Sequence, residues 1–162
     1  MLGGVALPGE VQYYDDGDPQ DAYDTLAGYA VAGTLGVVVM DGLSVEADAF
    51  YSRREEDNVD LYIYETASLM ANVKGTVALN DTFSVYGAAG VGMIWAVNDA
   101  FEYSGLGYQL IAGVSAKFTD NVSGVLEARY QDGFSPLVDS NDDASGFSVP
   151  VAAVLAGVKF SF

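Results

Sequence analysis

The strongest constraint on the fold is an alternation of apolar with small or polar residues in the last sixteen positions, 147–162. Counting back in steps of two from the final residue gives one apolar face: Phe162, Phe160, Val158, Ala156, Val154 and Ala152. The other face is small, with a single cation: Ser161, Lys159, Gly157, Leu155 and Ala153. A period of two is the side-chain period of a β-strand, so this stretch predicts a strand with one apolar face.

The same alternation recurs along the chain, which predicts eight antiparallel strands. The expected strands are Val5–Tyr14, Leu26–Val39, Leu43–Arg53, Leu61–Leu79, Thr82–Val97, Gly105–Phe118, Val122–Phe134 and Phe147–Phe162. The expected connections alternate in length, with short turns at 41–42, 80–81 and 119–121 and longer loops at 15–24, 54–60, 98–104 and 135–146. Asp41-Gly42 is a typical two-residue hairpin turn.

The faces of these strands are inverted relative to a water-soluble barrel. A soluble barrel shows water a charged face, whereas the polar faces here are rich in Gly, Ala and Ser and carry only isolated charges. The wide, branched and aromatic faces suit lipid, and eight strands enclose a space that side chains can fill. The expected aromatic girdles are Phe83, Phe118, Phe160 and Phe162 near the short turns, and Tyr13, Tyr51, Trp95, Tyr108 and Tyr130 toward the long loops. A soluble barrel is the less favoured alternative.

The C-terminal phenylalanine, the inverted alternation and the short–long loop rhythm together resemble the small eight-stranded outer-membrane barrels. That group includes the OmpA transmembrane domain, OmpX and the opacity proteins. The resemblance implies one all-β domain over residues 1–162, an antiparallel up-and-down transmembrane barrel in the bacterial outer membrane, with a signal peptide already removed. It also implies a monomer surrounded by outer-membrane lipids and lipopolysaccharide, with Phe160 and Phe162 as the signal for the outer-membrane assembly machinery.

Composition removes several functions. The net charge of −17, from 23 acidic and 6 basic residues, disfavours nucleic acid as a partner. There is no cysteine and no histidine, so thiol chemistry and the commonest general base and metal ligand are absent. We therefore expect no enzyme activity, no catalytic residue, no resident metal and no cofactor. GAAGVG at 87–92 lies within a strand, so these glycines are expected to leave room in the lumen and not to bind a nucleotide.

Charged residues with inward parity form the first candidate site. They are Glu10, Glu46, Asp48, Lys74, Lys117, Glu127, Arg129 and Lys159. Charges in a low-dielectric lumen must be paired, which predicts a salt-bridge network. The network could be a permanent plug, which we favour, or a gate that rearranges to open a narrow pore. The first interpretation predicts a structural or surface-interaction barrel with an unidentified extracellular partner, and the second a small-solute channel.

The acidic loops form the second candidate site. Carboxylates at Asp15, Asp16, Asp18, Asp142 and Asp143 could hold a divalent cation. Neither loop matches the spacing of an EF-hand calcium loop, so solvated loops are the favoured interpretation.

Overall fold

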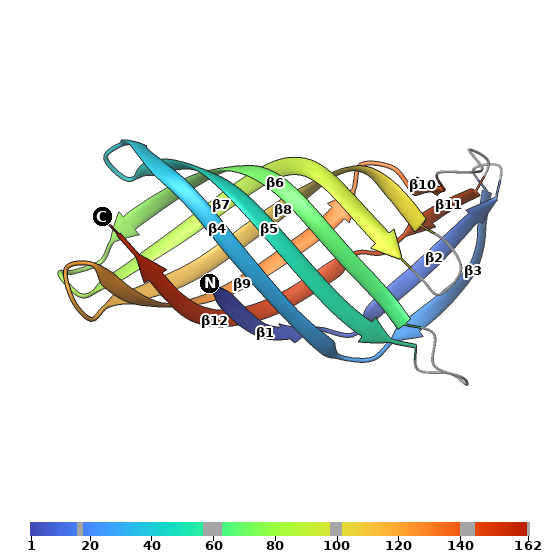
Figure 1. Ribbon diagram of the computed structural model, residues 1–162, viewed down its shortest axis with the longest axis horizontal. Helices are drawn as coiled ribbons and strands as arrows, with labels where there is room; N and C mark the ends of the chain where they lie inside the picture. The colour runs from blue at the N-terminus through green and yellow to red at the C-terminus, as the bar shows by residue number, and fades with distance from the viewer. Residues whose placement is uncertain (16–17, 57–62, 98–101, 140–144, 162) are drawn as a thin grey trace.

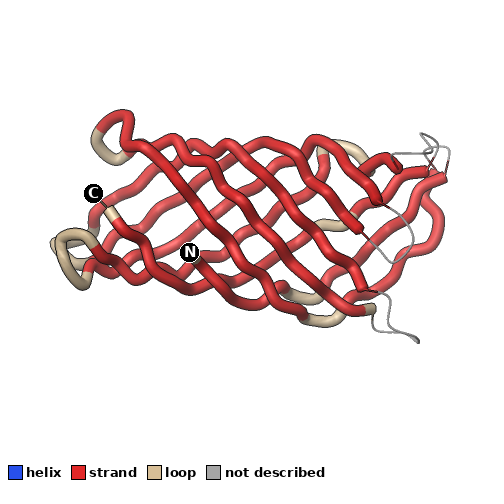
Figure 2. Tube along the Cα trace, in the orientation of Figure 1, coloured by secondary structure: helices blue, strands red, loops and turns tan. Residues whose placement is uncertain are grey.

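The computed structural model shows an antiparallel barrel whose strands are inclined to its long axis (Figures 1 and 2). It describes residues 1–15, 18–56, 63–97, 102–139 and 145–161. None of these residues belongs to a helix of the length and apolarity needed to cross a bilayer.

Eight strands close the ring, as the sequence predicts. They are β1 (Leu2–Ala6), β4 (Gly28–Met40), β5 (Leu43–Glu55), β6 (Ile63–Ala78), β7 (Phe83–Val97), β8 (Glu102–Lys117), β9 (Val122–Gly133) and β12 (Val151–Phe160). Consecutive strands from β4 to β9 pair as hairpins, β12 pairs with β9, and β1 fills the gap between β12 and β4. The short turns all lie at one end of the barrel, which we call the short-turn end.

Four further strands lie at the opposite end, which we call the long-loop end (Figure 1). They are β2 (Gly9–Asp15), β3 (Asp18–Thr25), β10 (Leu137–Asp139) and β11 (Ser145–Ser148). The sequence predicts loops at 15–24 and 135–146, and that prediction is wrong for the described residues that form these four strands. β2 pairs with β3 on one side and β11 on the other, and β10 joins β11 to β8. β3 alone is at a free edge of this sheet among the described strands.

Prolines mark where the N- and C-terminal strands are interrupted. Pro8 separates β1 from β2, Pro150 separates β11 from β12, and Pro136 lies between β9 and β10. Because proline lacks the N–H that a ladder needs, pairing stops at these positions. The expected single strands Val5–Tyr14 and Phe147–Phe162 are therefore each two strands.

The interruption at Pro8 also reverses the faces of the first strand. Val5 is exposed before it, whereas Val11, of the same parity, is completely buried after it. Tyr13 accordingly packs against the buried cluster at the long-loop end instead of joining an outer girdle. A one-residue irregularity exchanges inside and outside, because the side-chain period is two.

Elsewhere the predicted faces are observed. The outer face carries large apolar side chains, such as Leu69, Val91, Leu106 and Leu110, each more than half exposed. The inner face of β12 buries Ala153 and Leu155 while Val154 points outward. The interior contains an apolar cluster along β1, β4 and β12, a polar network beside it, and an aromatic cluster at the long-loop end.

Candidate functional site

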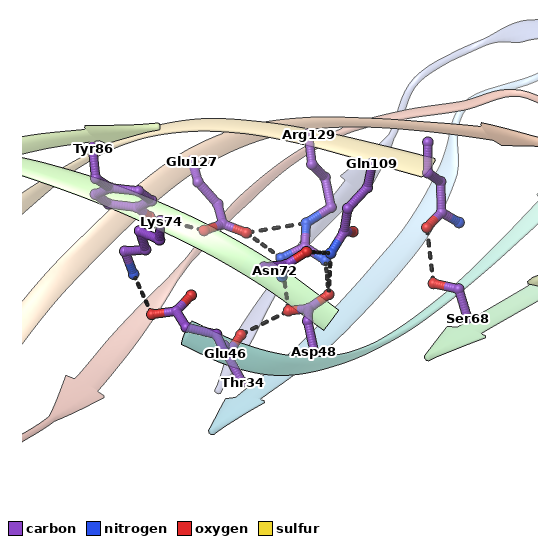
Figure 3. Close-up of polar contacts among 11 residues, drawn as sticks. Thr34, Glu46, Asp48, Ser68, Asn72, Lys74, Tyr86, Gln109, Glu127 and Arg129 are labelled. Carbon is purple, nitrogen blue, oxygen red and sulfur yellow. Dashed lines mark hydrogen bonds and ion pairs between the residues drawn. The ribbon is translucent and has the colours of Figure 1, made fainter. Parts of the chain in front are cut away.

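A buried ion pair crosses the lumen from β5 to β9 (Figure 3). Arg129 Nη1 lies 2.9 Å from Asp48 Oδ1, and Nη2 donates to Asp48 Oδ2 at 3.4 Å. The two side chains are 1% and 0% exposed. The guanidinium also lies over the Phe50 ring, 5.1 Å from its centroid. Two parallel contacts between a guanidinium and a carboxylate fix both groups in orientation.

Glu127 is the second carboxylate on Arg129. Arg129 Nε donates to Glu127 Oε1 at 3.0 Å, and Nη2 contacts the same oxygen. The other oxygen, Oε2, accepts a hydrogen bond from the Tyr86 hydroxyl of β7 at 2.8 Å. Tyr86 can stand in this position because Gly113 of β8 leaves the space: a Cβ on Gly113 would lie 2.3 Å from Tyr86 Cζ.

Neutral side chains extend the network to β4, β6 and β8. Gln109 Nε2 donates to Asp48 Oδ1 at 3.2 Å and to Asn72 Oδ1 at 2.8 Å. Thr34 Oγ1 donates to Asp48 Oδ2 at 2.7 Å. Asp48 therefore accepts from three side chains on three strands, which offsets the cost of burying its charge.

A second ion pair lies closer to the short-turn end. Lys74 Nζ of β6 lies 3.0 Å from Glu46 Oε1 of β5, with both side chains about nine-tenths buried. Lys74 Nζ is also 4.3 Å from the centroid of the Tyr86 ring, which carries the partial negative charge of an aromatic face. Tyr86 therefore lies between the two ion-pair groups.

An aromatic cluster fills the lumen at the long-loop end. Phe147 is 1% exposed, and its ring centroid lies 4.9 Å from that of Tyr13, 5.0 Å from Tyr103 and 5.8 Å from Tyr64. Between this cluster and the ion pairs, Ser68 Oγ donates to Gln131 Oε1 across the lumen at 2.9 Å.

The structure brings together five of the eight charged residues predicted to share the lumen: Glu46, Asp48, Lys74, Glu127 and Arg129. The prediction for Glu10 is wrong, because the face reversal at Pro8 leaves its side chain exposed beside Asp24. Lys117 pairs with Asp120 of its own turn at 2.9 Å. Lys159 is exposed near the short-turn end of β12 and makes no ion pair with any described residue, but it lies close enough to Lys74 and Glu46 to interact with their charges. Lys117 and Lys159 therefore make no direct contact with the network among the described residues.

The acidic loops are described only in part. Asp15 and Asp18 face each other at the end of the β2–β3 hairpin. Asp16, Asp142 and Asp143 lie outside the described residues, and so does Phe162. Within the described segments, no group of three or more acidic side chains is arranged to hold a metal. Phe160 is 60% exposed on the outer face of β12.

The sequence reasoning missed several members of this site. Asn72, Tyr86 and Gln109 have inward parity, but only charged residues were selected, so their part in the network was overlooked. The sequence predicts that strand β5 ends at Arg53, which places Arg54 in a loop, whereas the strand continues to Glu55. Arg54 is 1% exposed and points inward.

A family match and one solved structure agree with this architecture. The family described as outer membrane protein beta-barrel domain matches residues 2–154. The crystal structure of Neisserial surface protein A (NspA) is similar, with a TM-score of 0.67 at 16% identity, covering 99% of this chain and 97% of that one. Ail, the attachment invasion locus protein of Yersinia pestis, aligns with a TM-score of 0.48 at 17% identity, over 99% and 98% of the two chains. Among curated proteins, none matches the sequence significantly.

Proposed function

Because the chain belongs to the outer membrane protein beta-barrel domain family, we propose that it is a non-enzymatic barrel of the bacterial outer membrane with a closed lumen. In this proposal the barrel is a structural element of the envelope. Its long-loop end is the surface that meets molecules outside the cell.

The observation that carries the proposal is the arrangement around Arg129. Its guanidinium bridges Asp48 and Glu127, and the surrounding amides and hydroxyls extend the contacts over six strands. Arg129, Asp48, Asn72 and Gln109 are each at most 3% exposed, so the middle of the lumen has little room for solvent. The aromatic cluster supports a second closure nearer the long-loop end.

The β2–β3 hairpin is the most prominent described part of the proposed contact surface. Seven of the eight residues of β3 are exposed. The described residues of the hairpin carry carboxylates at Glu10, Asp15, Asp18, Asp21 and Asp24, and the hairpin has no basic residue. A surface of this kind favours cationic partners over anionic ones.

The test is single-channel conductance of the refolded protein in a planar bilayer, after a heat-dependent gel shift has shown that the barrel is folded. We expect a silent bilayer. Discrete and reproducible openings would contradict a closed lumen, provided that they change in Glu127→Ala and not in Glu65→Ala. Glu65 is the matched control because its carboxylate lies on the outer face of β6, bonded to Tyr51 and paired with Arg53.

A gated pore is the second candidate, and one specific feature favours it. Arg129 faces two carboxylates but can neutralise only one, and Asn72 Nδ2 and Gln109 Oε1 are buried without a hydrogen-bond partner in the described structure. These atoms could support a second pattern of pairing. If the network rearranges in this way, the same bilayer experiment gives openings whose frequency rises in Glu127→Ala.

A further inference from the structure

Arg54 is a buried cation that the network does not use. It lies on the inner face of β5, 1% exposed, and its Nη2 donates to the carbonyl oxygen of Pro150 at 3.0 Å. Its Nη1 is buried and has no hydrogen-bond partner. The guanidinium fits closely against the backbone, because a Cβ on Gly9 would lie 2.9 Å from Nη1.

The other buried cations of the lumen each have a carboxylate. Arg129 has Asp48 and Glu127, and Lys74 has Glu46. In contrast, no carboxylate of a described residue lies within 4.0 Å of Arg54. A buried charge without a counter-charge is strongly destabilising, and guanidinium does not lose its proton under ordinary conditions. We therefore expect a negatively charged group beside the Arg54 guanidinium.

The interior of the barrel contains further polar groups that have no hydrogen-bond partner. Ser52 precedes Arg54 by two residues on the same face of β5. Thr66 of β6 is the cross-strand neighbour of Ser52. The hydroxyls of both residues are buried without a partner, and so is Gln131 Nε2. A hydroxyl can donate as readily as it accepts, so these groups can serve an anion.

We propose that Arg54 holds a small monovalent anion, such as chloride, inside the barrel between the polar network and the aromatic cluster. Nη1 donates to the anion, and the Ser52 hydroxyl is available as a second donor. The anion is small because the guanidinium is enclosed and packed against Gly9. Since this position is closed to solvent in the folded barrel, the anion is taken up as the barrel closes. The inference does not depend on whether the lumen conducts.

The test is equilibrium urea unfolding in zwitterionic lipid vesicles, with sodium chloride replacing sodium gluconate at constant ionic strength. Gluconate is a much larger anion than chloride, and we expect the enclosed position to exclude it. In the wild-type protein we expect the urea midpoint to rise with chloride. Above the dissociation constant, each tenfold increase in chloride raises the folding equilibrium constant about tenfold. In Arg54→Met we expect no dependence on chloride.

Arg53→Gln is the matched control. Arg53 is the neighbouring arginine, but it is 37% exposed and paired with Glu65, so its loss should leave the chloride dependence unchanged. An identical chloride dependence in the wild type and Arg54→Met overturns the proposal. A wild-type urea midpoint that does not change with chloride overturns it as well. If Arg54→Met does not fold, crystals of the wild type grown in bromide decide the question. An anomalous peak beside Arg54 Nη1 supports the site, and its absence overturns it.

Discussion

Replacing Arg129 with methionine tests whether the lumen network is a true buried charge network. The substitution keeps a long apolar side chain against Phe50 but leaves Asp48 and Glu127 without their cation. Both carboxylates are at most 6% exposed. Breaking a buried pair by removing one partner costs about 3–5 kcal/mol, so we expect the free energy of unfolding to fall by about that amount.

The assay is equilibrium urea unfolding in lipid vesicles, followed by Trp95 fluorescence and by the heat-dependent gel shift. Arg53→Gln is the control, because the Arg53–Glu65 pair is 3.6 Å apart and more than a third exposed on both sides. An exposed pair of this kind contributes about 0–1 kcal/mol. The double variant Asp48→Asn with Arg129→Met should lose less than the sum of the two single variants, because neither charge is then left alone.

A loss in Arg129→Met no larger than in Arg53→Gln would refute the reasoning. It would mean that water reaches Asp48 and Glu127 and that the lumen of the folded barrel is hydrated. The same result would weaken the proposal of a closed barrel.

Three further substitutions test other parts of the fold by the same unfolding assay. Leu110→Arg places a charge on the outer face near the middle of β8, where Leu110 is 53% exposed. If that face meets lipid, the free energy of unfolding should fall by about 2–4 kcal/mol, and a fall of less than about 1 kcal/mol would contradict a lipid-facing surface. Gly42→Ala should cost about 1–2 kcal/mol because Gly42 has a φ of 72°, whereas Gly75→Ala, with no atom within 4 Å of the added carbon, should cost less. Gly113→Ala should lower the free energy of unfolding by about 1–3 kcal/mol, because the added carbon displaces Tyr86 from Glu127. Gly87→Ala is the control, since its added carbon meets no atom closer than 3.7 Å. Equal losses in the two variants would argue against the close contact between Gly113 and Tyr86.

The regular part of the barrel could be predicted because one period governs it. From β4 to β9 the strands run from hairpin to hairpin, and every second side chain faces the lumen. Such a pattern can be read residue by residue, as the burial of Asp48, Glu127 and Arg129 illustrates. Their pairing could be anticipated as well, since isolated charges in an enclosed lumen need partners.

The irregular part could not be predicted in the same way. Pro8 changes the parity of one strand, so Glu10 and Val11 exchange faces. Nothing in the local pattern before or after the proline reveals this change. β3 has the composition of a loop, and it forms a strand because its backbone pairs with that of β2. Arg54 was misplaced for a similar reason, since strand β5 continues through charged residues that the pattern assigned to a loop.

The pairing of β1 with β12 also constrains how the barrel is made. Every other pair in the ring joins strands that follow closely along the chain, but at this seam the Met1 amino group bonds to the Val158 carbonyl, 157 residues away. Contacts of such separation form slowly, because a long stretch of chain must first be brought together. Until the last strand is in place, the growing sheet has two open edges that could pair with other chains. The unfinished barrel is therefore open to pairing with other chains until β1 and β12 meet. Both edges need to be shielded during synthesis and insertion.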